Sequence, residues 1–209
     1  RNSCLKWGYE EVRTPTLEYL HLFTSAGTLT PALLGKVYSF LDWDGWSGER
    51  VVLRPDGTIP VARLYTESLE EQNLAKLFYI NNIFIFEATG KETREKWQCG
   101  AELIGANSTV ADVELIMLAG EVLRRLGMKK VEINLSHAGL IRGILQELNL
   151  SPEEQHDVFD KILDGDTSAL SRIESERPEL SNLLSLLVGM EGKSAAFLRN
   201  LNGLFRHNL

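Results

Sequence analysis

Residues 53–63 read Leu-Arg-Pro-Asp-Gly-Thr-Ile-Pro-Val-Ala-Arg, and this stretch leads from a strand into a helix. The apolar residues just before it are β-branched, as strands prefer. Thr58 is a good N-cap, and Pro60 fits the first helical turn, where no backbone donor is missed. Asp56 therefore stands with Thr58 at a strand-to-helix junction that faces the mouth of a sheet. The same Asp-Gly pair is also a common turn that needs no ligand.

A β-hairpin is predicted further along the chain. Residues 78–86 read Phe-Tyr-Ile-Asn-Asn-Ile-Phe-Ile-Phe, and residues 97–102 read Trp-Gln-Cys-Gly-Ala-Glu. Aromatic and β-branched residues of this kind favour half-buried or buried strands. Residues 88–93 between the two runs are polar and form the expected tip.

Gln98 and Glu102 lie four residues apart on the returning strand. Because side chains alternate along a strand, they share one face with Gly100 between them. We expect the glycine to leave room for a ligand, and the flanking amide and carboxylate to suit an ammonium group and an imidazole. The alternative is a polar, solvated sheet face or a buried pair. With Asp56 and Thr58 on the neighbouring segment, a binding pocket is favoured.

The other segments predict an α+β fold, in which an antiparallel sheet is flanked by helices. Thr16 is expected to cap the first helix, and Thr109 with Asp112 to form a capping box for a later one. Helices are expected at 16–26, 58–71, 111–126 and from about 138 onward, and further strands at 38–41, 51–54 and 131–135. The chain is accordingly divided into a sheet-rich part, residues 1–140, and a small helical segment, residues 141–209.

Composition excludes several classes of protein. The chain has 209 residues with a net charge of −7, and this acidic balance argues against a nucleic-acid partner, which usually meets a basic surface. No apolar run approaches the roughly 18 residues that cross a bilayer, and no signal peptide opens the chain. The two cysteines, Cys4 and Cys99, are far apart and are interpreted as reduced thiols of a cytoplasmic protein.

No metal site or cofactor is predicted. The four histidines are scattered without metal-ligand spacing. No glycine-rich phosphate loop, Ser-His-Asp set or nucleophilic cysteine signature is present. The chain lacks an initiator methionine, so we expect it to be part of a longer protein whose core continues beyond residue 209.

Taken together, the motifs resemble the amino-acid-activating core of class II aminoacyl-tRNA synthetases, in the histidine branch. The closer resemblance is to the regulatory subunits of ATP phosphoribosyltransferase, which are catalytically silent relatives of histidyl-tRNA synthetases. Residues 54–63 resemble that family's Arg-Pro-Asp-x-Thr-x-x-x-Ala-Arg, residues 98–105 its Gln-x-Gly-x-Glu-x-(Ile/Leu)-Gly, and residues 112–114 the Asp-Val-Glu that opens its next helix. The resemblance covers about residues 8–145.

The resemblance implies a fold, partners and a ligand. The fold is the class II antiparallel sheet with flanking helices, and dimers form through the region of residues 8–23. The partner is the short-form catalytic subunit of ATP phosphoribosyltransferase, which carries out the first step of histidine biosynthesis under feedback inhibition by histidine. The implied histidine-binding residues are Asp56, Thr58, Gln98 and Glu102. Synthetases carry glutamate at the first of these positions, so Asp56 is one methylene shorter.

Ile85 decides between the two branches. In the synthetases, an arginine after the phenylalanine of the first hairpin strand meets the phosphate of the adenylate, whereas here Ile85 follows Phe84. An aliphatic side chain cannot neutralise a phosphate, so no catalytic residue is predicted. Many regulatory subunits also keep this arginine, so Ile85 bears on ligand binding too. An alternative is a shifted register in which Arg94 or Lys91 takes its place.

Three other arginines have structural interpretations. Arg94, just beyond the hairpin tip, is expected to pair with Glu92 or Glu95 rather than with ATP or tRNA. Arg54 at a strand end and Arg63 on a helix can pair with carboxylates without any ligand.

Two functional alternatives remain open beside the regulatory subunit: a fragment of a histidyl-tRNA synthetase, and a structural scaffold with a vestigial histidine pocket.

Overall fold

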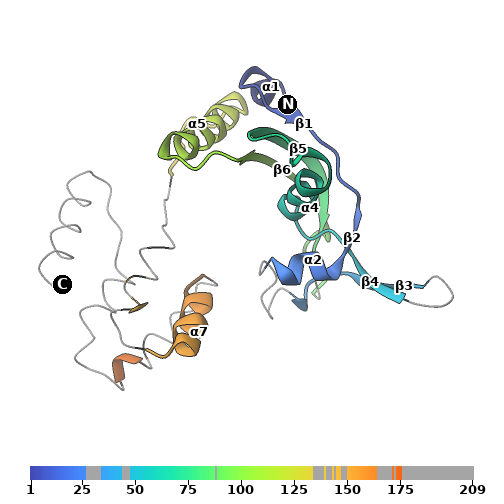
Figure 1. The fold of residues 1–209 in the computed structure, drawn as a ribbon, viewed down its shortest axis with the longest axis vertical. Coiled ribbons are helices and arrows are strands. Elements are labelled where there is room, and N and C mark those ends of the chain that lie inside the picture. Colours follow the sequence, from blue (N-terminus) through green and yellow to red (C-terminus); the bar gives the residue numbers. More distant parts are fainter. Residues whose placement is uncertain are drawn as a thin grey trace, which may run out of the picture. The chain divides into compact units, whose positions relative to one another are not determined.

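A computed structural model describes the protein in two compact units, Arg1–Glu132 and Ile133–Leu209 (Figure 1). The first unit contains both β-sheets. The described helix α7, Pro152–Leu163, lies in the second. The residues described are 1–26, 34–43, 48–87, 89–133, 139, 143, 145–146, 150–163, 171 and 173–175.

The first sheet has the strand order β1-β5-β6 and is built on the predicted hairpin. Strands β5 (Ala75–Phe84) and β6 (Glu95–Ile104) pair in antiparallel register without interruption. The two-residue strand β1 (Glu10–Glu11) adds a parallel edge to β5. The sheet is therefore mixed rather than wholly antiparallel.

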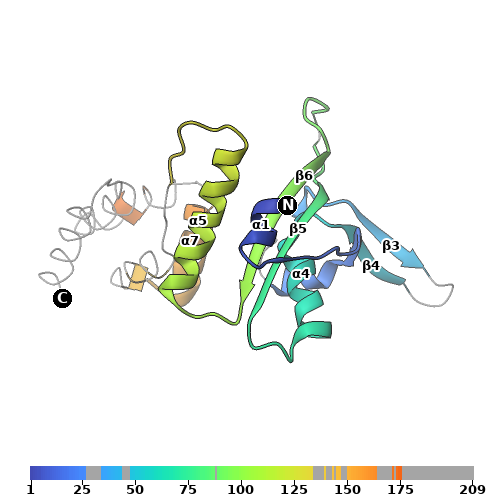
Figure 2. The ribbon, with the colours of Figure 1, turned by 90° about the horizontal axis from the view of Figure 1, so that it is seen from above.

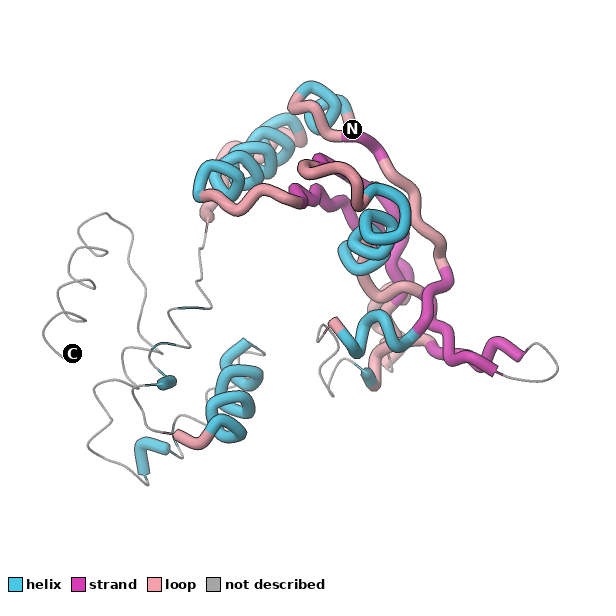
Figure 3. Tube along the Cα trace, viewed as in Figure 1, coloured by secondary structure: helices cyan, strands magenta, loops and turns pink. Residues whose placement is uncertain are grey.

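Helices cover both faces of this sheet (Figures 1 and 3). On one face lie α1 (Asn2–Lys6) and α5 (Thr109–Arg125), on the other α4 (Thr58–Leu64) with its π-helical continuation η1 (Tyr65–Leu69). Because side chains alternate along β5, they contribute to two hydrophobic cores, one on each face of the sheet. The first core contains Cys4, Tyr9, Phe78 and Leu118; the second contains Val61, Ala75, Leu77 and Tyr79.

The second sheet has the order β2-β4-β3, and its β3–β4 hairpin projects from the rest of the unit (Figure 2). Strand β4 (Gly48–Leu53) pairs antiparallel with both β2 (Leu17–Tyr19) and β3 (Ser39–Trp43). The predicted strands at 38–41 and 51–54 are thus confirmed. Helix α2 (Leu20–Ser25) follows β2 directly.

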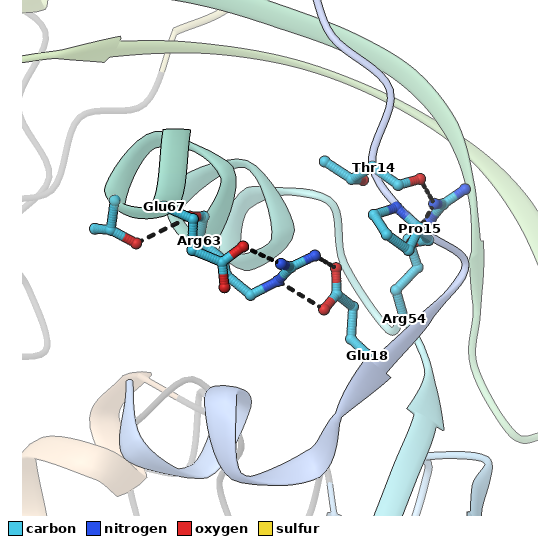
Figure 4. Close-up of polar contacts among 7 residues, drawn as sticks. Thr14, Pro15, Glu18, Arg54, Arg63 and Glu67 are labelled. Carbon is cyan, nitrogen blue, oxygen red and sulfur yellow. Dashed lines mark hydrogen bonds and ion pairs between the residues drawn. The ribbon is translucent and has the colours of Figure 1, made fainter. Parts of the chain in front are cut away.

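Arg54 ties the two sheets together, and its predicted structural role is confirmed. The side chain is 5% exposed. Its Nε donates to the Asn82 carbonyl at 2.7 Å. Its Nη1 donates to the carbonyls of Thr14 at 2.8 Å and Pro15 at 2.7 Å (Figure 4). Its partners are backbone carbonyls, where the sequence predicted carboxylates. These hydrogen bonds fasten the segment between β4 and α4 to β5 and to the segment between β1 and β2.

Two expected helix starts are wrong, and one expected strand is wrong over the residues that the structure describes. The predicted helix at 16–26 begins only at Leu20, because residues 17–19 pair with β4. Helix α5 is capped by Ser108, whose Oγ accepts from the Ala111 N–H at 3.3 Å, one residue before the expected Thr109. Residues 131–133 form no strand, and the rest of that predicted strand lies outside the described residues.

The start of α4 also differs from the prediction. Thr58 is its first residue rather than its N-cap, which is Gly57. The side chain that caps the helix belongs to Asp56: its Oδ1 accepts from the N–H groups of Thr58 at 2.6 Å and Ile59 at 3.3 Å. In the second unit, Ser151 and Glu154 form a reciprocal capping box ahead of α7.

Candidate amino-acid site

The structure brings the four predicted site residues together where the start of α4 meets β6. The hydroxyl of Thr58 donates to Glu102 Oε1 at 3.0 Å. Gln98 Oε1 accepts from the backbone N–H of Gly57 at 2.7 Å. Two hydrogen bonds thus join the strand-to-helix junction to the returning strand, with Asp56 beside them as the cap of α4. The group presents two carboxylates, one hydroxyl and one amide.

The electrostatics of Glu102 distinguish this group from an ordinary polar surface. Burial raises the pKa of Glu102 above its usual value, and the nearby charge of Asp56 raises it further. The hydrogen bond from Thr58 opposes this shift without cancelling it. Among the described residues, no ion pair joins Glu102 or Asp56 to a cation. A half-buried carboxylate without a cationic partner is suited to bind a positively charged ligand.

Tyr79 lies at the centre of the group and was not among the predicted site residues. It is 2% exposed, and its partner across the hairpin is Gly100. The Tyr79 hydroxyl lies 3.3 Å from Gln98 Oε1 and 3.4 Å from Thr58 Oγ1. The pattern of an aromatic residue opposite a glycine could have suggested this contact, but only once the strand register was known.

The expected space over Gly100 is therefore filled. A Cβ atom placed on Gly100 would lie 2.3 Å from Tyr79 Cζ, so the aromatic ring lies directly against the glycine backbone. The prediction that Gly100 leaves room for a ligand is wrong in this respect, because the cross-strand tyrosine takes that volume. A ligand would meet the side chains of Gln98 and Glu102 rather than the backbone between them.

Ile85 follows the last residue of β5 and is half-buried. Its N–H donates to the Arg94 carbonyl at 3.0 Å, which continues the hairpin pairing beyond Phe84 and Glu95. Arg94 turns back over the hairpin tip: its Nε donates to the Glu87 carbonyl at 3.1 Å, and its guanidinium lies 5.1 Å from the centre of the Phe86 ring.

The predicted pairing of Arg94 with Glu92 or Glu95 is wrong, because both carboxylates have other partners. Glu92 pairs with Lys96 at 3.0 Å, and Glu95 accepts from the side chain of Asn82. Arg63 behaves as predicted. Its guanidinium donates to both oxygens of Glu18 at 2.9 Å and to Glu67 at 2.5 Å (Figure 4).

No described residues are arranged as a metal site. Among them, no group of three or more His, Cys, Asp or Glu side chains could hold an ion. His21 stacks on Tyr19, and His156 lies 3.6 Å from Asp160. His137 and His207 lie outside the described residues. No helix of the part that the structure describes is long and apolar enough to span a membrane.

Comparison with known proteins places the chain in a family. The family model described as histidyl-tRNA synthetase matches residues 2–208. The chain belongs to the histidyl-tRNA synthetase family. Within it, the chain is 62% identical over 200 residues to an ATP phosphoribosyltransferase regulatory subunit of Dehalococcoides mccartyi, and the match covers 96% of this chain and 48% of that relative. The predicted resemblance to the regulatory branch is confirmed.

More distant family members are named either as histidine–tRNA ligases or as regulatory subunits. A histidine–tRNA ligase of Methanosarcina acetivorans is 36% identical over 200 residues, covering 92% of this chain and 46% of the relative. The crystal structure of an ATP phosphoribosyltransferase regulatory subunit/histidyl-tRNA synthetase from Bacillus halodurans superposes with a TM-score of 0.75 at 26% identity, covering 97% of this chain and 52% of that one. The expected class II α+β fold is confirmed. The chain spans about half the length of the relatives that it matches.

Proposed function

We propose that this chain acts as a non-catalytic regulatory subunit of ATP phosphoribosyltransferase, required for activity and for feedback control of histidine biosynthesis. The observation that carries the proposal is the 62% identity to a relative of that name over 96% of the chain. In this proposal the partner is the short-form catalytic subunit in a cytoplasmic hetero-oligomer. The subunit itself forms dimers through residues 8–23. Residues 1–140 are the first part of the core, and residues 141–209 are a helical insertion.

The proposed ligand is histidine, held between the start of α4 and β6. Two carboxylates lie near each other there, and the pKa of Glu102 is raised by burial and by the charge of Asp56. An ammonium group placed between them would favour both ionised forms and relieve this repulsion. The Thr58 hydroxyl and the Gln98 amide supply the additional polar contacts that an amino acid requires.

Ile85 supports a binding role without adenylate formation. Transfer of an adenylyl group develops charge on phosphate, and fixed cations stabilise that charge. Loss of such a group typically lowers the rate on the order of a hundredfold or more. Arg94 cannot stand in without leaving Glu87 and Phe86, where its guanidinium is held. In the proposed complex, the glycosyl transfer belongs to the partner subunit.

Calorimetric titration of the full-length protein with L-histidine tests the site. Asp56→Asn and Glu102→Gln should each weaken binding by about 1–3 kcal/mol, because each removes a charge-assisted hydrogen bond. Asparagine also caps helices well, so Asp56→Asn keeps the start of α4 while removing the charge. Glu114→Gln is the matched control. It neutralises a carboxylate on the opposite face of the hairpin and should leave the affinity unchanged.

Three outcomes would contradict parts of the proposal. No heat from the intact protein would favour a scaffold with a vestigial pocket. Equal affinity in all three variants would mean that histidine binds elsewhere. The 36% identity to a histidine–tRNA ligase keeps a second function in view, that of a synthetase fragment. Pyrophosphate exchange in the presence of histidine and ATP separates the two, since clear exchange would end the non-catalytic interpretation.

A further inference from the structure

The aromatic ring of Tyr79 is fixed between two glycines that come from different parts of the chain. A Cβ atom on Gly100 of β6 would lie 2.3 Å from its Cζ, and one on Gly57, just before α4, would lie 2.2 Å from its Cε2. Real Cβ atoms do not approach so closely, so each backbone contacts the ring where any other residue would push it away. The ring therefore has one position, and this position determines where its hydroxyl lies.

The Tyr79 hydroxyl contacts both polar side chains that connect α4 to β6. It lies 3.3 Å from Gln98 Oε1 and 3.4 Å from Thr58 Oγ1. Thr58 has a single hydroxyl proton, which it donates to Glu102 at 3.0 Å, so its oxygen can act toward Tyr79 only as an acceptor. Tyr79 likewise has one proton, which it donates to Gln98 Oε1 and shares with Thr58 Oγ1 as a three-centre hydrogen bond. Gln98 Oε1 already accepts from the Gly57 N–H at 2.7 Å, which orients the amide with its oxygen toward Tyr79.

We propose that Tyr79 is a positioning residue of this site, whose hydroxyl fixes the rotamers of Gln98 and Thr58 and, through Thr58, that of Glu102. This inference rests on the proposed histidine-binding function. Its physical basis is preorganisation: side chains already held in their binding geometry lose less conformational freedom when a ligand arrives. Burial raises the pKa of Tyr79, so the hydroxyl keeps its proton at neutral pH.

The ring and the hydroxyl have separable roles, and Tyr79→Phe separates them. Phenylalanine keeps the ring between the two glycines, so the core of α4 and the hairpin should remain intact. Only the contacts to Gln98 and Thr58 are lost. Since an ordinary hydrogen bond contributes about 1 kcal/mol, the dissociation constant for L-histidine should rise about fivefold or more.

Tyr65→Phe is the matched control. Tyr65 belongs to η1 and packs against the same core, but its hydroxyl donates to the Gln72 carbonyl at 2.9 Å, away from the site. Both variants lose one hydroxyl group with its single proton and should lose a similar amount of stability in urea. Only Tyr79→Phe should change the affinity for histidine, measured by calorimetry on the full-length protein.

A double variant adds a measurement that a merely structural role would not affect. If Tyr79 acts through Thr58, the loss of affinity in Tyr79→Phe with Thr58→Ala should be smaller than the product of the two single effects. Independent effects that multiply would overturn the positioning role. So would an unchanged affinity in Tyr79→Phe, or equal losses in Tyr79→Phe and Tyr65→Phe. An intact protein that does not bind histidine at all would instead refute the proposed function, and this inference with it.

Discussion

Two networks of tyrosine and glutamate lie on opposite faces of the β5–β6 hairpin, and they differ in one respect. On the α5 face, Glu114 Oε1 accepts from the Tyr9 hydroxyl at 3.0 Å and from the Lys76 ammonium at 2.7 Å. On the α4 face, Glu102 accepts from Thr58, which in turn contacts Tyr79. Glu114 therefore has a cation, Lys76, beside it. Glu102 has another carboxylate, that of Asp56, nearby instead.

The difference appears in the acid–base behaviour of the two glutamates. The hydrogen bond from Lys76, with a further one from Tyr9, holds the pKa of Glu114 below its usual value. Burial and the charge of Asp56 raise the pKa of Glu102. One network is electrostatically complete and fastens the N-terminal segment to β5 and α5. In the other, no ion pair joins Glu102 to a cation within the part of the chain that the structure describes, and this is the reason for proposing a ligand there.

Gly100→Ala should cause the largest change in stability, and it should do so by disrupting the α4 face alone. Its new Cβ would collide with the Tyr79 ring, which Gly57 blocks from the other side. Overpacking of this kind typically destabilises by about 1–3 kcal/mol. Gly120→Ala in α5 is the control. Its Cβ would meet only Arg124 Nη2 at 3.7 Å, and alanine should stabilise the helix by about 0.5–1 kcal/mol.

Urea unfolding of both alanine variants measures the two effects, and a second substitution tests the cause. If the clash with the ring is responsible, Tyr79→Ala in the Gly100→Ala background should cost less than the sum of the single changes. Strict additivity, or a Gly100→Ala protein as stable as the parent, would mean that the ring is not fixed. The positioning role proposed for Tyr79 would then lose its structural basis.

The sequence predicted the four residues of the candidate site but not Tyr79, which we propose as a positioning residue of that site. Gln98 and Glu102 follow from strand alternation, and Asp56 from a turn that precedes a helix; both are local rules. The position of Tyr79 depends on which residue of β6 lies opposite it. One step of register would have placed Tyr79 opposite Cys99 or Ala101, so the contact with Gly100 could not be derived from either strand alone.

The short strands were missed for a related reason. Strands β1 and β2 contain two and three residues, too few to show alternation. They are strands because β5 and β4 offer hydrogen-bond partners, and pairing with β4 overrides the helical pattern expected after Thr16. The helix caps differ by one or two residues because serine, threonine and aspartate are interchangeable as caps in sequence. Only the geometry distinguishes Asp56 from Thr58 and Ser108 from Thr109.

Tyr9→Phe should have a smaller effect and tests the network on the α5 face. It removes the hydroxyl that donates to Glu114 at 3.0 Å, but Lys76 remains as a partner. The expected loss of stability is about 0.5–1.5 kcal/mol, as for a single hydrogen bond. Histidine affinity should stay at the parent value, in contrast to Tyr79→Phe. A clear loss of affinity in calorimetry would show that the two faces are coupled through the hairpin, and the separation drawn here would fail.

The smallest expected effects, opposite in sign, come from neutralising each glutamate and following stability against pH. Glu114 has a depressed pKa in the folded protein, so its contribution is present above the unfolded value of about 4.3 and is lost as the pH falls through the folded pKa. Glu114→Gln should therefore be less stable than the parent at neutral pH, by about 0.2–1 kcal/mol for a partly exposed pair, and this difference should shrink in acid.

Glu102 should show the reverse trend. Its folded pKa is raised, so the parent loses stability as the pH rises from about 4.3 through that folded pKa. Glu102→Gln lacks this loss and should gain on the parent over the same interval, while binding histidine more weakly. Thermal unfolding from about pH 4 to pH 7.5 measures both differences. Two curves of the same sign would mean that Glu102 already has a cationic partner within the protein, and the reason to place a ligand on the α4 face would be gone.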